Sequence, residues 1–483
     1  MFIPLYILIP LAVLAAIALL ERILLPGVRV VLRRQLRRLA EELNARMRLR
    51  LQPFKLTRKR DVEAMVVHDP EVARAAKLYR EERGLSWDEV MDLVRAYARE
   101  IVPTFNVLLY YRLSHWLARR IVNAVYRVRV GFLDKRAIAG ISPDVAAVFV
   151  MNHRSNFDYV LVSFLVSRHA ALSYAVGEWA RVWPLDTLIR RLGAYFVRRG
   201  TPDPLYRKVL ERYVQLSIES GVTQGIFPEG GLTRDGRLRQ PKAGLLHYVL
   251  KRFDPQGPRD LVFIPVGINY DRVFEDRSHV LESTGKAAPV SVGRTIRVTL
   301  GWLAKQGWLL ARRRLRRFGY ATVNFGLPIS TRAHLKELGK DLRTLSPEEY
   351  RAEVSQLAER VMAAIARAVP VAPVPLVASA VLAADSAQPD EAEVRARFEA
   401  LLAALPAAST SLARTDPAEL FESGVEMLAL RHVLVREEGR LRINPEDRAL
   451  LEFYANSIAH LMPGAMPAVE VQPRPGSESG SAA

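Results

Sequence analysis

Short apolar runs alternate with helical stretches between residues 143 and 330. Five of these runs are rich in β-branched and aromatic residues: Val145–Val150, Ala194–Val197, Thr223–Phe227, Leu261–Val266 and Ile296–Leu300. Continuous apolar strands separated by helices are typical of a sheet whose two faces are both covered by helices. The pattern therefore predicts an α/β domain over 143–345, with a central mixed sheet covered by helices.

Helical patterns flank this region on both sides. Asp69 precedes Pro70 as a cap, and Ser86 with Glu89 fits a capping box. We expect a basic juxtamembrane helix and a helical N-terminal domain over 29–142, and a helical C-terminal domain over 346–463 that is interrupted at a proline-rich joint. The final segment, 464–483, is rich in Gly, Ser, Pro and Ala and predicts a disordered tail.

The N-terminus begins with an apolar run. The 19 residues from Phe2 to Leu20 carry no formal charge, which is just long enough to span a hydrocarbon core of roughly 30 Å. A cleaved signal peptide is the alternative, but no Lys or Arg precedes the run. We therefore expect a retained transmembrane helix within 1–28, with the body of the protein on the cytoplasmic face of the inner membrane.

The chain is strongly basic. Seventy Lys and Arg against 51 Asp and Glu give a net charge of +19, which favours nucleic acid, anionic membranes or phosphorylated substrates as partners. Twelve of the basic residues lie between Arg29 and Arg60, directly after the apolar run. Because no nucleic-acid-binding motif accompanies this charge, we expect anionic membrane lipids as a partner and no nucleic acid. The absence of cysteine excludes disulfides and thiolate chemistry.

A His and an Asp follow the first apolar run at a spacing of five, His153 and Asp158. On one ideal helix they would be about 140° apart, so they can meet only if His153 lies in the turn between strand and helix. Ser155 or Asn156 would then cap the helix, and Asp158 in its first turn would orient the imidazole as a general base. The alternative is a capped helix with a satisfied histidine. Ser155 is not expected as a nucleophile, because no G-x-S-x-G elbow surrounds it.

Three further patches follow predicted strands, where open α/β sheets place their sites. They are Gly193–Gly200, the Gly-rich turn Phe227–Arg237 with Lys242 after it, and Ile264–Asp271. Each has a plain structural alternative, as surface charge, a salt bridge or a turn. Arginine forks bind phosphate bidentately, and backbone N–H groups of a Gly-rich loop add to them. We expect the substrate-binding residues to be Arg154, Ser155, Arg198, Arg199, Glu229, Gly230, Gly231, Thr233, Arg234, Arg237 and Lys242.

In their order and spacing, these blocks resemble those of the glycerol-3-phosphate acyltransferases. The resemblance continues into two later motifs, Val323–Pro328 and Tyr454–Leu461. It implies transfer of a fatty acyl group to the sn-1 hydroxyl of glycerol 3-phosphate, giving lysophosphatidate in the first step of phospholipid synthesis. The donor would be acyl-CoA or an acyl carrier protein thioester, as co-substrate rather than cofactor. Leu232 stands where the family commonly has an arginine, which is a departure in the predicted phosphate site.

The predicted mechanism uses His153, oriented by Asp158, to take the proton of the attacking hydroxyl and pass it to the leaving sulfur. No metal is expected, because the nine histidines are scattered without ligand spacing. Dihydroxyacetone phosphate and lysophosphatidate are alternative acceptors. A non-catalytic membrane scaffold is the alternative from another class.

Overall fold

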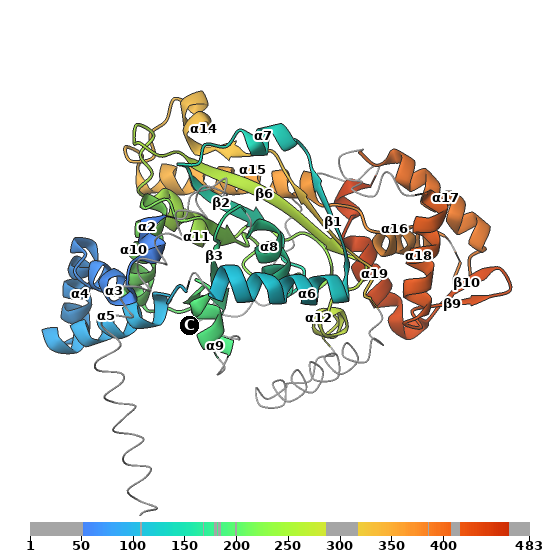
Figure 1. The fold of residues 1–483 in the computed structure, drawn as a ribbon, viewed down its shortest axis with the longest axis horizontal. Coiled ribbons are helices and arrows are strands. Elements are labelled where there is room, and N and C mark those ends of the chain that lie inside the picture. Colours follow the sequence, from blue (N-terminus) through green and yellow to red (C-terminus); the bar gives the residue numbers. More distant parts are fainter. Residues whose placement is uncertain are drawn as a thin grey trace, which may run out of the picture.

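The structure, a computed structural model, describes residues 52–106, 109–167, 169–177, 181, 185–198, 200–285, 317–384, 386–406 and 416–462 (Figure 1). The predicted anchor, the strand expected at 296–300, the tail at 464–483 and Arg199 lie outside the described residues. Within the described ranges, no single helix has both the length and the apolar character to cross a bilayer. One bent pair, α15 (Pro347–Ala368) with α16 (Pro373–Leu382), meets both criteria, but its two helices join at 90°.

A mixed sheet forms the centre of the molecule, as the alternating runs predict. Its strand order is β1 (Arg127–Phe132), β7 (Tyr320–Phe325), β6 (Leu261–Tyr270), β2 (Ala146–Met151), β5 (Gln224–Ile226), β3 (Ser173–Gly177) and β4 (Tyr195–Val197). β8 (Ile329–Ser330) pairs with β6. Neighbouring strands are parallel except where β6 meets β7 and β8. The carboxyl ends of β2, β5, β3 and β4 therefore lie along one edge.

Helices cover both faces of this sheet (Figure 1). Side chains alternate along β2: Phe149 and Met151 pack in the core with α6 (His115–Val125) and α8 (Asp158–Val166). Val148 and Val150 pack in the core on the other face, with α10 (Pro204–Glu219), α11 (Gly244–Leu250) and α15. Both faces of the strand are apolar because both are buried, which is why β2 lacks the polar alternation of a half-exposed strand.

The remaining helices lie before, between and after the strands. They are α2 (Pro53–Leu56), α3 (Lys59–Val67), α4 (Pro70–Arg83), α5 (Trp87–Ile101), α7 (Lys135–Ala139), α9 (Leu185–Arg191), α12 (Asp276–Ser283), α14 (Thr331–Leu338), α17 (Glu391–Ala404), α18 (Pro417–Ala429) and α19 (Arg448–Asn456), with a π-helical turn at Leu109–Ser114 and 3-10 turns at Pro445–Asp447 and Ala459–Leu461.

Two predicted helix starts are confirmed. The Asp69 side chain accepts the backbone N–H of Glu71 at 2.9 Å, with Pro70 at the first helical position. Ser86 and Glu89 form a complete capping box at the start of α5. These local signals do not depend on tertiary contacts, because each cap satisfies backbone N–H groups of its own helix.

Strands occur in two places where only helix is expected. β1 lies within the predicted helical N-terminal region, yet it pairs with β7 at the edge of the sheet. The hairpin of β9 (Leu434–Glu437) and β10 (Arg440–Ile443) lies within the predicted helical C-terminal region. β1 and β10 alternate charged with apolar residues, and β9 has two apolar residues followed by two charged ones. Each strand has only four to six residues, too short a stretch to be told from a charged helix by periodicity. The domain boundaries at 143 and 345 stay predictions.

Candidate active site

His153 and Asp158 meet at the carboxyl edge of the sheet. His153 follows β2, and Asp158 is the first residue of α8. The imidazole Nδ1 lies 3.0 Å from Asp158 Oδ2, and the two side chains are 2% and 0% exposed. This is the arrangement that the five-residue spacing predicts for a strand-to-helix turn. The catalytic role of the pair stays a prediction.

The Asp158 carboxylate is held by four donors. Besides the imidazole, Oδ2 accepts the backbone N–H groups of Arg154 at 2.8 Å and Ser155 at 3.0 Å. Oδ1 accepts the Tyr270 hydroxyl at 2.6 Å. Burial, and next the charge of Asp158, raise the pKa of Tyr270 well above its usual value, so it stays a donor. Because the carboxylate only accepts, His153 Nδ1 carries the proton and Nε2 presents its lone pair.

The predicted cap of α8 is wrong. The N-cap residue is Phe157, without a side-chain cap, and N–H groups at the start of the helix donate to backbone carbonyls instead, Asp158 to Ser155 and Val160 to Phe157, both at 3.0 Å. Ser155 Oγ instead accepts the N–H of Phe157 at 3.0 Å and donates to Glu275 Oε2 at 2.7 Å. Burial raises the pKa of Glu275, with Asp158 as a further cause. Ser155 therefore links the turn to the loop after β6.

Two aromatic rings fix the plane of the imidazole. The Phe227 ring stacks on His153 with a centroid separation of 3.9 Å, and Tyr159 meets it edge-on at 5.5 Å. Phe227 follows β5 and Tyr159 lies in the first turn of α8. Because both rings are apolar on their faces, they limit rotation of His153 and keep water from its sides.

The Gly-rich loop holds the backbone of His153 from both sides. Glu229 Oε1 accepts the N–H of His153 at 3.0 Å, and its Oε2 accepts the N–H of Arg239 at 3.1 Å. Thr233 donates its N–H to the carbonyl of His153 at 3.0 Å. Burial raises the pKa of Glu229 to about 7. Gly230 has φ +67°, and a Cβ there would lie 2.6 Å from Lys242 Cδ, so a side chain would strain this turn.

Arg154 is buried and bound by protein carbonyls. Its guanidinium donates to the carbonyl of Gly236 in the Gly-rich loop and to that of Ser457, the latter at 2.8 Å. The Asn456 side chain donates to the carbonyl of Asp235 at 2.9 Å. The C-terminal motif is thus fastened to the turn that carries His153. We assign Arg154 to positioning these segments, whereas the sequence placed it among the substrate-binding residues.

The predicted phosphate-binding cations divide into two groups. Arg198 forms two bonds to Glu100, at 2.9 and 2.6 Å, and Arg234 contacts Glu282 at 2.9 Å. Arg237 and Lys242 are exposed beside the Gly-rich loop. Arg198 follows β4, three strands from β2, or about 14 Å along the edge. Arg198 therefore lies far from His153 along the shared edge, whereas Arg234 and Arg237 belong to the Gly-rich loop that holds the His153 backbone.

Comparison with known proteins decides which family this constellation belongs to. Residues 135–269 match the sequence profile described as Acyltransferase, and residues 306–469 match the Glycerol-3-phosphate acyltransferase C-terminal region. Together the two matches cover the turn from His153 to Asp158, the Gly-rich loop and the C-terminal motif. The chain belongs to the glycerol-3-phosphate acyltransferase family.

Curated members of this family are similar over most of this chain. The glycerol-3-phosphate acyltransferase of Ectopseudomonas mendocina is 29% identical over 435 residues, which are 86% of this chain and 50% of that protein. Those of Pseudomonas savastanoi and Alteromonas mediterranea are 28% and 27% identical, over 84% of this chain and 49% and 50% of theirs. The chain thus spans about half the length of the curated relatives it matches.

Three residues of this acyltransferase-family site were missed by sequence reasoning. They are Tyr270, Glu275 and Asn152. The Asn152 side chain accepts the N–H of Ile268 at 2.8 Å and donates to the Ile268 carbonyl at 2.9 Å. Tyr270 and Glu275 lie at and beyond the end of β6, and Asn152 directly follows β2. Their positions at strand ends were a usable signal, but the contacts bridge more than a hundred residues of sequence.

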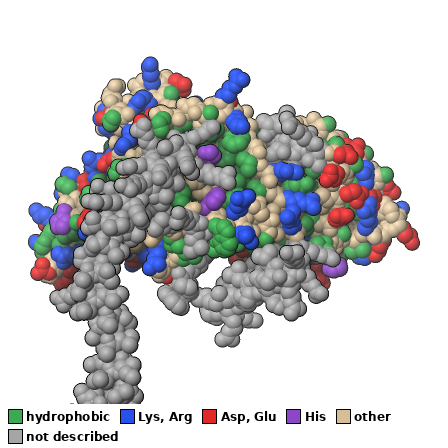
Figure 2. All heavy atoms as spheres, in the orientation of Figure 1, with side chains coloured by type: hydrophobic (Ala, Val, Ile, Leu, Met, Phe, Trp, Pro, Cys, Tyr) green, Lys and Arg blue, Asp and Glu red, His purple; other side chains and the backbone are tan. Residues whose placement is uncertain are grey.

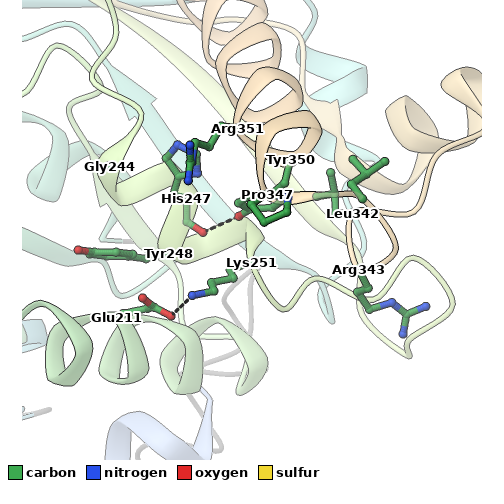
Figure 3. A pocket seen from close by; sticks show the side chains of 11 residues that line it. Glu211, Gly244, His247, Tyr248, Lys251, Leu342, Arg343, Pro347, Tyr350 and Arg351 are labelled. Carbon is green, nitrogen blue, oxygen red and sulfur yellow. Dashed lines mark hydrogen bonds and ion pairs between the residues drawn. The ribbon is translucent and has the colours of Figure 1, made fainter. Parts of the chain in front are cut away.

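Within the described part of the chain, no group of three His, Cys, Asp or Glu side chains could hold a metal ion. A cavity of about 580 Å³ lies on the face of the sheet opposite α8, between α10, α11 and the start of α15 (Figure 3). Burial is the main cause that lowers the pKa of His247 there, and the positive charges of Arg351 and Lys251 lower it further. The sheet separates this cavity from His153 and Asp158.

Proposed function

We propose that this protein transfers a fatty acyl group from a thioester, acyl-CoA or an acyl carrier protein, to the sn-1 hydroxyl of glycerol 3-phosphate. The observation that carries the proposal is the buried contact between His153 Nδ1 and Asp158 Oδ2, in a chain whose relatives bear that activity as their name. The product would be lysophosphatidate, the first intermediate of phospholipid synthesis.

His153 is the base in this proposal. Its Nε2 takes the proton as the hydroxyl oxygen attacks the thioester carbonyl, and Asp158 stabilises the imidazolium that forms. The tetrahedral intermediate then collapses, the carbon–sulfur bond breaks, and the proton on Nε2 passes to the leaving thiolate. An ester and a free thiol result, with no covalent enzyme intermediate and no metal or other cofactor required.

The Gly-rich loop offers a backbone donor for the oxyanion. The N–H of Gly230 is already used, because it donates to the carbonyl of Phe227 at 3.0 Å. For the N–H of Gly231, no acceptor is found among the residues that the structure describes. Since Glu229 and Thr233 fasten this loop to the His153 backbone, we propose Gly231 as the backbone donor that stabilises the developing charge.

The phosphate of the acceptor needs cations at the same edge. Arg198, Arg234, Arg237 and Lys242 supply them in this proposal, and Arg199, outside the described residues, stays a prediction. Arg198 and Arg234 are held by Glu100 and Glu282, so a phosphate must share or displace these carboxylates. Dihydroxyacetone phosphate carries the same phosphate and is the alternative small acceptor, and lysophosphatidate is the larger one.

We also propose attachment to the cytoplasmic face of the inner membrane through the N-terminal apolar run and contact with anionic lipids. Both rest on the sequence. Alkaline carbonate extraction of membranes, with N-terminal sequencing of the retained protein, tests the anchor. Recovery of a chain that begins near residue 20 would contradict it.

The decisive experiment is a transfer assay with purified protein. Isotopically labelled glycerol 3-phosphate is incubated with acyl-CoA or with acyl carrier protein thioester, and the products are identified by mass. Dihydroxyacetone phosphate and lysophosphatidate are assayed in parallel, with His153→Ala as the inactive control. If the wild-type protein binds lipid but transfers nothing to any acceptor, it is a scaffold and the proposal fails.

A further inference from the structure

One surface combines exposed apolar side chains with unpaired arginines. On α6, Trp116 is 53% and Leu117 42% exposed, and Arg119 and Arg120 are exposed along the same stripe. On β1, Val130 and Phe132 are each 41% exposed. Their register places them on the sheet face that α6 covers, since Val130 and Phe132 align with the α6-side residues Val323 and Phe325. We call these six residues the α6–β1 face.

The charge of this face is of one sign. From 109 to 133 the sequence contains five arginines and no Asp or Glu. Among the described residues, Arg119 and Arg120 form no ion pair, whereas Arg198 and Arg234 are each bound to a carboxylate. Figure 2 shows the acidic side chains of this view mainly at the two ends of the molecule, with Lys, Arg and hydrophobic side chains in the centre. The cations are thus free to meet an external anion.

The side-chain types suit a membrane surface. The Arg120 guanidinium lies 5.1 Å from the centre of the Trp116 ring, so the pair presents an indole with a cation on its face. Indole rings settle at the level of lipid headgroups, arginine binds their phosphates, and leucine and phenylalanine enter the acyl boundary. A soluble protein partner would need carboxylates placed opposite both arginines, whereas an anionic bilayer supplies negative charge everywhere.

We propose that the α6–β1 face docks on an anionic lipid surface. The interaction is separate from the N-terminal apolar run and does not rest on the proposed chemistry. It also fixes an orientation: α6 packs on α8, and Tyr126 at its end contacts Phe157, the residue before Asp158, with a ring separation of 5.4 Å. Docking therefore brings the side of the sheet that carries His153 toward the bilayer.

The chain has no cysteine, so a single label can report on this face in the full-length protein. Leu117→Cys carries a nitroxide, and Leu338→Cys is the matched control, because Leu338 is 43% exposed on α14 at the opposite face of the sheet. Both proteins are reconstituted into vesicles of phosphatidylcholine alone, or of phosphatidylcholine with about 30% phosphatidylglycerol as the anionic lipid. Collision of the label with oxygen and with a water-soluble nickel chelate is then measured.

We expect the nickel collision rate at position 117 to fall at least roughly fivefold in the anionic vesicles, and that at 338 to stay unchanged. Adding Arg119→Glu and Arg120→Glu should restore most of the collision rate. A label at 117 that stays aqueous in both vesicle types overturns the proposal. Spin–spin broadening between labels, together with a nickel collision rate at position 117 that falls equally in both vesicle types, would show a second copy of the chain on this face. That result would also overturn the proposal.

Discussion

The Tyr270 hydroxyl donates to Oδ1 of Asp158 at 2.6 Å, on the carboxylate oxygen opposite the one that contacts His153. The two residues are 112 positions apart, and both are buried. Tyr270 therefore prevents the carboxylate from rotating away from the imidazole without touching the imidazole itself. It is a positioning residue for the proposed base.

Tyr270→Phe should lower kcat by about tenfold to a hundredfold, which corresponds to the loss of roughly 1.5–3 kcal/mol from one hydrogen bond to a charged group. KM for both substrates should stay unchanged, because neither is expected to contact this hydroxyl. Steady-state kinetics with each substrate varied separately checks this split. Tyr195→Phe is the control, since it removes another buried hydroxyl, for which the described part of the chain offers no hydrogen-bond partner.

His153→Ala and Asp158→Asn should each lower kcat by orders of magnitude while acceptor binding survives. The double variant should be little worse than His153→Ala alone, because the two side chains act as one unit. Single-turnover rates of the four proteins measure this coupling. Losses that multiply, or a fall in Tm that accounts for the lost activity, would mean that the pair only stabilises the start of α8.

Variants of Arg198 and Glu100 distinguish a phosphate-binding role of Arg198 from a structural one. If Arg198 binds the acceptor phosphate, Arg198→Ala should raise acceptor KM tenfold or more, as expected for a charge-assisted bond of about 1.5–3 kcal/mol, with the thioester KM unchanged. Glu100→Gln keeps the arginine and frees it from its carboxylate, so it should leave acceptor KM unchanged or lower it. Equal damage from both variants to both KM values would make this ion pair structural.

Asp271 makes folding stability depend on pH. Its two oxygens accept the N–H groups of Val374 and Tyr320, yet burial is the larger effect and raises its pKa to about 7. The contribution of the Asp271 carboxyl to folding stability is therefore fully present below about pH 4, where this carboxyl is protonated in both the unfolded and the folded protein. It is lost as the pH rises through about 7. In denaturant unfolding, Asp271→Asn should cost more stability at pH 5 than at pH 8, by on the order of 1–3 kcal/mol.

The exposed Asp88 provides the comparison, since Asp88→Asn should change stability about equally at the two pH values. If Asp271→Asn costs the same at pH 5 and pH 8, the buried carboxyl titrates near its ordinary pKa and the prediction fails.

Much of the central fold could be predicted because the signals are local. β2 and β6 are continuous apolar runs, and a run apolar on both faces requires a sheet covered on both sides. The caps at Asp69 and Ser86 use donors and acceptors of their own helices. β1 could not be separated from helix, because its residues are exposed or half-buried on both faces, so it lacks the continuous apolar signal of a buried strand.

The sequence by itself predicted the pairing of His153 with Asp158, because two side chains five residues apart can meet here only if His153 lies in a strand-to-helix turn. Only the tertiary structure decided what surrounds them. Arg154 was expected to bind substrate, but its guanidinium is bound to the carbonyls of Gly236 and Ser457, 82 and 303 positions away. Such partners depend on how β5, β6 and the C-terminal segment pack around β2. The same packing buries the guanidinium, and a buried charged group needs hydrogen-bond acceptors such as these carbonyls.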